Sequence, residues 1–540
     1  MHSDVLDDRF FAILAEFLSW MHGPRKDVVD VESGRLLTRV ATASPEDAQE
    51  SLMTVQAAQV VWTEMGPYGR AKVLARFSQL VWKYQNEMVA LSQMLSGKSL
   101  IDAHEEFLDV LSTAKNIKFS SRRLGKHRAG RGALPGSRWR VYQRPLGIVG
   151  IFTSPDWPLS SINDVLQAIA AGNAVVNFVT PQAALGAVLM HAMLVDAGMP
   201  YGLWKIIPDT TSKAGRAVIP GLDMVTVLGS EKLGRRISRI CQEYRVPFKG
   251  FLQVLNVGVI CEDCRFDHAV RAMARAGFQH AGQTVNSAEI IWVQDSIFDY
   301  FKLALKDFVS DQVAIGSLDS AETTLGAMLT PQRAQTIQEL VDDAVQRGAE
   351  LVLGGNTAPD LGPSFYEPTI LARVPQDAAI CASELHGPLI YLQPFQDLTE
   401  VSRFLGTSRH SYCIYLFTES EFMMRDFIQA ANGAAVIIND SYMSLYSTWQ
   451  APIQGIRSTG SGIRHGLESI LQYSRVQSVA RQEGHPWISN DLQPGNRMER
   501  WSFFSSRAAV IASILFTDTV IAYAWRNLRH HIKNRIHGPV

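Results

Sequence analysis

Cysteine is scarce in this chain and follows no framework. The five cysteines among 540 residues are Cys241, Cys261, Cys264, Cys381 and Cys413. An odd number of scattered cysteines in a long chain without a secretory signal fits a reducing compartment and excludes a small disulfide-held domain. Cys261-Glu-Asp-Cys264 has the spacing of redox and zinc sites, but no second pair completes a metal shell, so it indicates a strand end and a turn.

The sequence also lacks an excess of charged residues of either sign. Lys plus Arg number 51 and Asp plus Glu number 52, which gives a formal net charge of -1. This balance gives no indication of nucleic acid or of an acidic partner, and it favours a small molecule or another protein as the partner. With 46% hydrophobic and 19% charged residues, the chain is able to bury the cores of two or three domains.

Long apolar runs are absent except near the end of the chain. Residues 1–27 predict an amphipathic extension rather than a signal peptide. In the C-terminal extension 483–540, an apolar helix is expected over 508–525, with basic residues on both sides. A bilayer span needs about 20 apolar residues, and Asp518 would cost roughly 2.5 to 3.5 kcal/mol in its middle. A packed helix, an interfacial helix and a span all stay open, and the expected location is intracellular, in the cytoplasm or on the cytosolic face of a membrane.

Short apolar runs alternate with helical periodicity over much of the chain, from about residue 28 to 248 and again from 255 to 438. Buried parallel strands are expected at 148–152, 174–177 and 225–228, and helices at 267–278, 297–309 and 331–347. Alternation of strands and helices predicts an α/β protein with doubly wound sheets.

One loop and several further segments carry the strongest signal in the sequence. The loop reads His280-Ala-Gly-Gln-Thr-Val-Asn-Ser-Ala-Glu289. The other segments are Arg144-Pro-Leu-Gly-Ile-Val-Gly150, Ala170-Ala-Gly-Asn-Ala-Val-Val176, Gly229-Ser-Glu-Lys-Leu-Gly-Arg235, Leu353-Gly-Gly355, Tyr366-Glu-Pro-Thr-Ile-Leu371, Glu384-Leu-His-Gly-Pro388 and residues 455–466. In order and spacing, from about residue 28 to 479, they resemble the aldehyde dehydrogenase superfamily. The loop, with Glu289, is most similar to its fungal and plant membrane-associated branch.

The resemblance implies a division of the chain into domains. A Rossmann-like cofactor-binding domain is expected over 28–121 and 145–254, an α/β catalytic-type domain over 255–445, and an oligomerisation arm over 122–144 and 446–482. It also implies a homodimer or larger homo-oligomer, or a hetero-oligomer with an active paralogue, formed when a strand of one subunit extends the sheet of the other.

The nucleophile is the first catalytic group that the resemblance places. Aldehyde oxidation in this family needs a thiolate that adds to the carbonyl. The matching position, after Gly282 and Gln283 with one spacer, is Val285, which has no lone pair for attack. Ser287 is displaced by two residues, and errors of about 1 Å already cost about 100-fold, so Ser287 is expected to be structural.

Two further catalytic positions are changed as well. Phe251 stands where the family has the glutamate that activates water. Asp156 stands where it has the asparagine that donates to the oxyanion, and an ionised carboxylate accepts hydrogen bonds but cannot donate them. No catalytic residue of the family is therefore expected to be retained at these positions.

The cofactor positions are mixed. Phe178 and Pro181 stand where the family has two polar partners of the adenosine ribose. The retained positions are Gly229, Ser230 and Gly234, at the start of a predicted helix, and Glu384, which the family uses on the nicotinamide ribose. The resemblance implies that binding of NAD or NADP is either weak or lost. The alternative role of Gly229 and Gly234 is close packing of helix and strand.

Together these changes favour a pseudoenzyme with a binding, regulatory or scaffolding role, because loss of a nucleophile alone costs on the order of a million-fold in turnover. Two alternatives stay open. One is a repurposed metabolic enzyme that uses the old substrate tunnel, with Asp156, His386 or Glu289 as acid or base. The other is an NAD(P)-dependent aldehyde oxidoreductase of low or altered activity. Each of these hypotheses leaves room for a small-molecule ligand, and no metal is expected.

Overall fold

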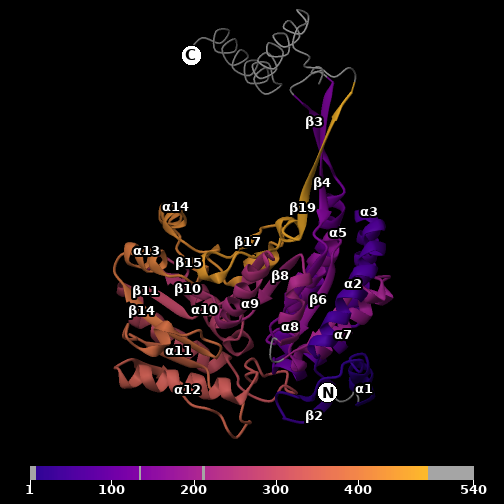
Figure 1. Ribbon diagram of the computed structural model, residues 1–540. Coiled ribbons are helices and arrows are strands. Elements are labelled where there is room, and N and C mark those ends of the chain that lie inside the picture. Colours follow the sequence, from indigo (N-terminus) through magenta and orange to yellow (C-terminus); the bar gives the residue numbers. More distant parts are fainter. Residues whose placement is uncertain (1–5, 7, 133–135, 210–212, 484–540) are drawn as a thin grey trace, which may run out of the picture. The chain divides into compact units, whose positions relative to one another are not determined.

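The chain folds as an α/β protein with two large sheets that are mainly parallel, as the computed structural model in Figure 1 shows. The structure describes residue 6 and residues 8–132, 136–209 and 213–483. Its contacts divide the chain into one unit of Met1–Arg123 and Pro145–Ser474 and another of Leu124–Arg144 and Arg475–Val540. The predicted α/β class is confirmed.

The first unit begins with a short helix, a hairpin and four successive helices. Their bounds are α1 (Asp8–Glu16), β1 (Arg25–Val29), β2 (Leu36–Ala41), α2 (Pro45–Glu64), α3 (Gly66–Lys83), α4 (Gln85–Ser96) and α5 (Leu100–Leu124). The predicted alternation of strands and helices is wrong over 45–124, because these helices bury side chains such as Trp62, Phe77 and Phe107 with no strand between them.

A parallel sheet of five strands, in the order β7-β6-β5-β8-β9, follows in the first unit. The bounds are β5 (Ile148–Phe152), β6 (Ala174–Val179), β7 (Trp204–Pro208), β8 (Met224–Leu228) and β9 (Phe248–Phe251). β5, β6 and β8 are buried at every position, which explains their continuous apolar sequence and confirms the three predicted strands. From β7 the chain returns to the other side of β5, so the carboxyl ends of β5 and β8 form a switch point, where open α/β sheets bind ligands.

The helices of this part are α6 (Asn163–Ala171), α7 (Pro181–Asp196), α8 (Lys213–Val218) and α9 (Glu231–Tyr244). The side chain of Thr180 caps α7, and that of Ser230 caps α9 by accepting from the Leu233 N–H. Both caps follow a strand directly or after one glycine, so each helix begins at the carboxyl edge of the sheet.

A second sheet of seven strands has the order β12-β13-β14-β11-β10-β15-β16, and all its pairs are parallel except β12 with β13. Its strands are β10 (Leu255–Ile260), β11 (Ile290–Gln294), β12 (Glu350–Leu353), β13 (Thr369–Ala372), β14 (Leu389–Phe395), β15 (Ser411–Phe417) and β16 (Ala435–Ile438). The helices are α10 (Phe266–Phe278), α11 (Phe298–Gln312), α12 (Pro331–Gln346), α13 (Leu398–Thr407) and α14 (Glu421–Ala430). The three helices predicted here are confirmed to within a few residues.

Residues that follow β16 stay with the first unit up to residue 474. They form α15 (Tyr442–Ser447), β17 (Ile453–Gln454), β18 (Ile463–Arg464) and α16 (Glu468–Leu471). The sequence analysis places residues 446–482 in the oligomerisation arm, whereas the contacts in the structure assign residues 446–474 to the first unit. The physical reason is a buried link in which Arg464 pairs with Asp164 at 3.3 Å and the Tyr473 hydroxyl donates to Asp164 at 3.2 Å.

The second unit contains a three-stranded sheet in the order β19-β4-β3. Its strands are β3 (Arg128–Arg131), β4 (Ser137–Pro145) and β19 (Ser474–Gln482), of which β3 and β4 pair as an antiparallel hairpin. The apolar segment 508–525 lies outside the described residues. Among the residues that the structure describes, none of the helices is both long and apolar enough to cross a bilayer.

Candidate active site

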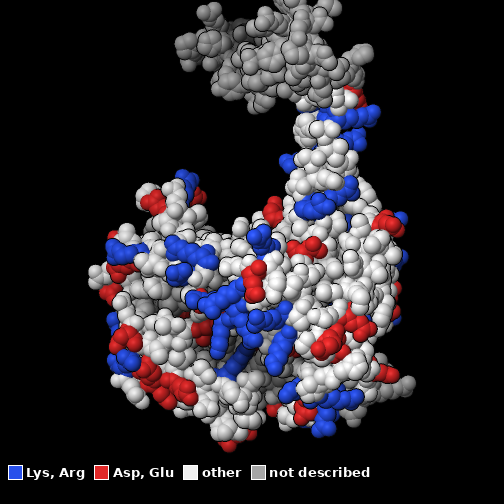
Figure 2. All heavy atoms as spheres, in the orientation of Figure 1, with Lys and Arg blue, Asp and Glu red and all other residues white. Residues whose placement is uncertain are grey.

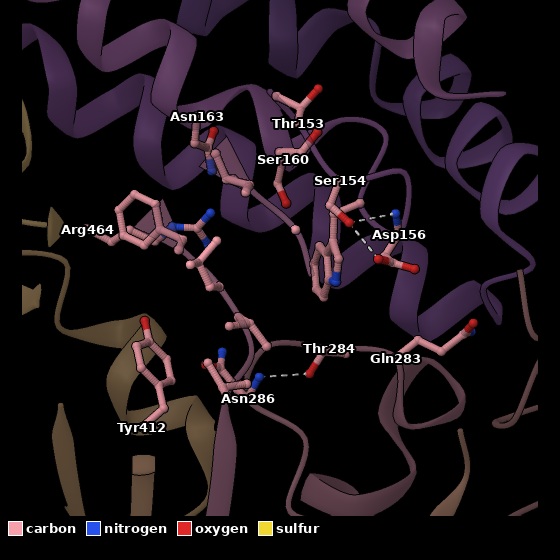
Figure 3. A pocket seen from close by; sticks show the side chains of 18 of the residues that line it. Thr153, Ser154, Asp156, Ser160, Asn163, Gln283, Thr284, Asn286, Tyr412 and Arg464 are labelled. Atoms are coloured by element: carbon pink, nitrogen blue, oxygen red, sulfur yellow. Dashed lines mark hydrogen bonds between the residues drawn. The ribbon is translucent and has the colours of Figure 1, made fainter. Parts of the chain in front are cut away.

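A cavity of about 340 Å³ opens at the switch point of the five-stranded sheet. Its wall includes Thr153 and Ser154 after β5, Gly229 and Ser230 after β8, and the loop 283–286 from the second sheet. Val285, Phe251 and Asp156 all line it. The three changed catalytic positions, far apart in sequence, therefore meet in one cavity. Figure 3 shows Asp156 and Gln283 at one end of it and Asn163 and Arg464 at the other.

The loop that carries Val285 has an unusual backbone. His280, Ala281 and Gly282 have φ values of 45°, 50° and 68°, so three successive residues are left-handed. A Cβ atom on Gly282 would lie 1.9 Å from the Gly387 carbonyl oxygen, which only glycine avoids. Beyond the turn, the Asn256 side chain donates to the carbonyls of Val285 at 3.0 Å and Ser287 at 2.8 Å. The backbone is thus held in a fixed conformation that presents residue 285 to the cavity.

Ser287 faces away from the position of a nucleophile. Its hydroxyl donates to the carbonyl oxygens of Ala276 and Gly277, at 3.1 Å in each case, and its side chain is buried. These bonds tie the loop to the end of α10. The structural role expected for Ser287 agrees with this geometry.

Phe251 is the last residue of β9, and its ring occupies the cavity wall. A Cβ atom on Gly462 would lie 2.2 Å from the ring, so the ring packs directly on that glycine. On another side the guanidinium of Arg464 lies 4.7 Å from the ring centroid, a cation–π contact. A hydrocarbon ring with these neighbours has no group that accepts a proton from water.

Asp156 is ionised and held by an arginine. Arg333, from the first turn of α12, pairs with the Asp156 carboxylate and also donates to the Gln283 side chain at 3.0 Å. Burial by itself would raise the pKa of Asp156, but the charges of Arg333 and His386 and hydrogen bonds from Arg333 and Ser154 outweigh it and hold the pKa below its ordinary value. The carboxylate accepts hydrogen bonds here and offers no proton to an oxyanion.

A buried ion pair supports the segment that carries Asp156. Lys98 and Glu106 are fully buried and pair at 2.8 Å. Lys98 also donates to the Asp156 carbonyl at 2.8 Å, and Glu106 accepts from the backbone N–H groups of Leu159 at 2.8 Å and Ser160 at 2.9 Å. Both ions have their hydrogen-bonding groups satisfied, which a buried pair needs in order to be stable.

The four retained cofactor positions do not all lie at the cavity. Gly229, Ser230 and Glu384 line it. Gly234 is not among its described lining residues, and a Cβ atom there would lie 2.4 Å from a methyl carbon of Leu252. Gly234 therefore serves helix–strand packing, whereas Gly229, with φ of 155°, leaves the start of α9 open for a ligand.

The adenosine-ribose positions have become part of the core. Phe178, near the end of β6, is buried and stacks on Phe152 with ring centroids 4.4 Å apart. Pro181 opens α7 behind the Thr180 cap. Neither side chain carries a group that binds a ribose hydroxyl.

Basic side chains surround the start of α9. Figure 2 shows Lys and Arg gathered over the part of the surface where Figure 1 labels this helix. The exposed basic residues of the helix are Lys232, Arg235, Arg236 and Arg239. Gly229 and Ser230, which come directly before this helix, line the cavity, and a helix N-terminus with cations on the same helix attracts diphosphate groups.

Glu289 is a buried carboxyl group in the cavity wall. Burial, and then the charge of Glu384, raise its pKa well above the ordinary value. Glu384 lies 3.1 Å from the ring of His386, which also lines the cavity. The cavity therefore contains a carboxyl group that keeps its proton to higher pH than usual beside a carboxyl–imidazole pair.

None of the five cysteines is among the described residues that line the cavity. Cys413 comes nearest to the loop, with its sulfur 3.7 Å from the Asn286 side chain, but it is fully buried. Burial raises the pKa of the Cys413 thiol to about 12. A thiolate that replaces the missing nucleophile is therefore not available from these residues.

Sequence reasoning missed the charged groups that complete the site. Arg333 approaches from α12, far from the motifs in sequence. Arg464, of β18, belongs to the segment 455–466, but nothing in that segment assigned it a role in the site. Asp109 of α5 and Gln167 of α6 also line the cavity. The apolar periodicity of their helices gives the only available signal, and it does not distinguish a polar cavity residue from a surface residue.

Comparison with known proteins places the chain in a family. A sequence model of the aldehyde dehydrogenase family matches residues 20–479. Because the match covers most of the chain, the protein belongs to the aldehyde dehydrogenase family. Its aldehyde dehydrogenase-like fold, with Rossmann-like sheets, is thereby confirmed.

Individual relatives agree with this assignment. The chain is 28% identical over 457 residues, 84% of this chain and 88% of the relative, to a Mycolicibacterium smegmatis protein named "Putative succinate-semialdehyde dehydrogenase", with NADP(+) as cofactor in its name. It is 25% identical to the Escherichia coli succinate-semialdehyde dehydrogenase for NADP(+), with 85% of this chain and 95% of that protein covered. These relatives are bacterial, so the fungal and plant branch stays a prediction.

Solved structures show the same fold. An NAD-dependent aldehyde dehydrogenase from Sinorhizobium meliloti superposes with a TM-score of 0.82 at 22% identity, covering 86% of this chain and 93% of that one. An NAD+ complex of an aldehyde dehydrogenase from Bacillus cereus has a TM-score of 0.80 at 20% identity, with 85% and 93% covered.

The raised pKa of Glu289 predicts a pH-dependent cost in stability. Below pH 4.5, the ordinary pKa of a glutamate, both the folded and unfolded states carry the proton. As the pH rises, the unfolded state releases this proton first, so the free energy of unfolding falls until the folded pKa is passed. Glu289→Gln should therefore unfold at higher urea concentration than the parent at about pH 8, and the difference should vanish at about pH 4.

The matched control is Glu322→Gln, which removes an exposed carboxyl group. It should leave the urea midpoint unchanged at both pH values. A Glu289→Gln protein that is less stable than the parent at about pH 8 would show that Glu289 is ionised and paired in the folded state.

Proposed function

We propose that this protein binds a carbonyl compound and a nicotinamide dinucleotide in the cavity without the thiol-dependent oxidation of its family, and that it acts as a regulatory or scaffolding partner. One observation carries the proposal: Val285 occupies the cavity wall at the nucleophile position, with Phe251 and ionised Asp156 beside it. Gly229, Ser230, Glu384 and the basic face of α9 support retained binding of the dinucleotide.

NAD(P)-dependent oxidation of aldehydes by another route is the second candidate, and the comparisons favour it. The chain belongs to a family of aldehyde dehydrogenases, and the relatives named above are succinate-semialdehyde dehydrogenases for NADP(+). Without a thiol, the hydrated aldehyde would lose a hydride to the oxidised nicotinamide and a proton to a base, which yields the carboxylic acid. His386 lines the cavity and is the group available to accept this proton, and Glu289, which keeps its own proton to higher pH than usual, lines the same cavity.

Binding and turnover separate the two candidates. Calorimetric titration with NAD+ and NADP+ should show binding, and the mixture with a panel of aldehydes that includes succinate semialdehyde should produce no reduced cofactor by absorbance. Turnover that is lost in His386→Ala or Glu289→Gln would establish the second candidate. Absence of binding by both dinucleotides would contradict the first.

Partial restoration of the catalytic groups tests whether these three positions determine thiol-dependent activity. Val285→Cys alone should remain almost inactive, because Phe251 takes no proton from water and Asp156 opposes an oxyanion. Adding Phe251→Glu and Asp156→Asn should raise esterase or dehydrogenase activity clearly above the single variant. Val285→Ala with the same two additions is the control without a thiol. Strong activity in the parent that Ser287→Ala abolishes would refute the assignment of Val285.

We also propose that the chain self-associates or pairs with an active paralogue through β19. This strand is at the edge of its sheet, and its residues after Ser474 are exposed. An exposed edge strand is a template for pairing with a second chain. Light scattering should show a dimer or a larger oligomer, and deletion of residues 475–540 should give a monomer or aggregate. A stable monomer of the intact chain would contradict the proposal.

A further inference from the structure

The cavity is lined by an excess of acidic groups. Four carboxyl-bearing residues, Asp109, Asp156, Glu289 and Glu384, are among its described lining residues, against the single guanidinium of Arg464. Asp156 is already paired with Arg333, Glu384 faces His386, and the raised pKa of Glu289 keeps its proton bound. The remaining carboxyl group is Asp109, which lies at the end of the cavity near Arg464.

The guanidinium group of Arg464 already has partners. Its guanidinium pairs at 3.3 Å with Asp164, whose side chain is fully buried, and its face lies over the ring of Phe251. Asp109 accepts a hydrogen bond from the Asn163 side-chain nitrogen at 2.9 Å. Its interaction with Arg464 is electrostatic, without a hydrogen bond. Asp109 and Asp164 therefore share the charge of one guanidinium at this end of the cavity.

Two acceptor atoms at the same end have no partner. The side-chain oxygens of Asn163 and Gln167 are buried and make no hydrogen bond with the described residues. Both residues line the cavity, and they are four positions apart on α6, so they lie on the same face of the helix. Gln167 is only 3% exposed. A buried polar atom without a partner is costly, which points to a ligand that donates to it.

We propose that this end of the cavity binds a protonated primary amine at the far end of the ligand. An ammonium group has three donors and no acceptor, and it meets three acceptors here: the Asp109 carboxylate and the oxygens of Asn163 and Gln167. Trp157, Leu445 and Val285 are among the apolar residues that line the cavity, which suits an alkyl chain.

The inference rests on the proposed function, because it names the ligand class of the same cavity. It also separates this chain from its named relatives. A succinate semialdehyde molecule carries a carboxylate, which would face the carboxyl group of Asp109 and find Arg464 already paired with Asp164. An aldehyde or alcohol with an amine at its other end meets no such repulsion.

Three ligands that differ only in one end group test the inference on the full chain. Aminohexanol, hexanediol and hydroxyhexanoate present an ammonium, a hydroxyl and a carboxylate on the same chain. Calorimetric titration should give aminohexanol at least about tenfold higher affinity than hexanediol, which is about 1.4 kcal/mol, and hydroxyhexanoate the weakest binding. Equal or tighter binding of hydroxyhexanoate would overturn the inference.

Variants at the acceptors sharpen the test. Asp109→Asn should lower the affinity for aminohexanol at least about tenfold and leave that for hexanediol nearly unchanged. Gln167→Leu should weaken aminohexanol binding too, and it provides a second measurement should Asp109→Asn fail to fold. Asp360→Asn, an exposed loop residue, is the matched control and should have no effect. Unchanged aminohexanol affinity in folded Asp109→Asn and Gln167→Leu proteins would contradict the assignment.

The pH dependence of aminohexanol binding provides an independent measurement. Burial raises the pKa of Asp109 to about 6, against the lowering effects of Arg464, Ser160 and Asn163, and Glu106 adds to the rise. Tyr446 also faces this carboxyl group. Aminohexanol affinity should therefore fall as the pH drops through about 6 in the parent and stay flat in Asp109→Asn. Binding of NAD+ or NADP+ without any preference for the amine would overturn this inference alone, whereas absence of both would also overturn the proposed function.

Discussion

The buried pair of Lys98 and Glu106 is the interaction on which the site depends. Breaking such a pair from one side costs about 3–5 kcal/mol, because it leaves an uncompensated charge in the interior. Through the Asp156 carbonyl and the N–H groups of Leu159 and Ser160, the pair fixes the segment after β5 at a set depth in the cavity. Residue 156 is therefore held close to the loop of Val285 whatever side chain it carries.

With that segment fixed, two of the changed catalytic positions, Asp156 and Phe251, and the cofactor position Phe178 have neighbours that match their side chains. The Asp156 carboxylate is matched by Arg333 and Gln283. The Phe251 ring packs on Gly462 and under Arg464, and Phe178 stacks on Phe152. An isolated substitution would leave a cavity or an unpaired charge. Because these positions are packed or paired, their side chains form one compatible arrangement.

The sequence was sufficient for the elements with strong local patterns. β5, β6 and β8 are apolar throughout, and their buried positions follow from that alone. The meeting of Val285, Phe251 and Asp156 followed from the resemblance. The four helices over 45–124 were missed because their apolar stripes resemble those of helices between strands. Arg333, Arg464 and Gln167 were missed since their roles arise from contacts between residues 50 to 300 positions apart, as in the pairs Gln283–Arg333 and Asp164–Arg464, which no local pattern encodes.

Charge is divided along the path into the cavity, and this division constrains any ligand. The exposed face of α9, which begins at the cavity, is basic, whereas carboxyl groups outnumber guanidinium groups in the described lining inside. A ligand with anionic groups at one end and a neutral or cationic group at the other is attracted when its anionic end lies at α9 and its other end lies inside the cavity. In the reverse orientation, each charged end would meet charges of its own sign. An oxidised nicotinamide dinucleotide, with its diphosphate and its positively charged ring, has this polarity.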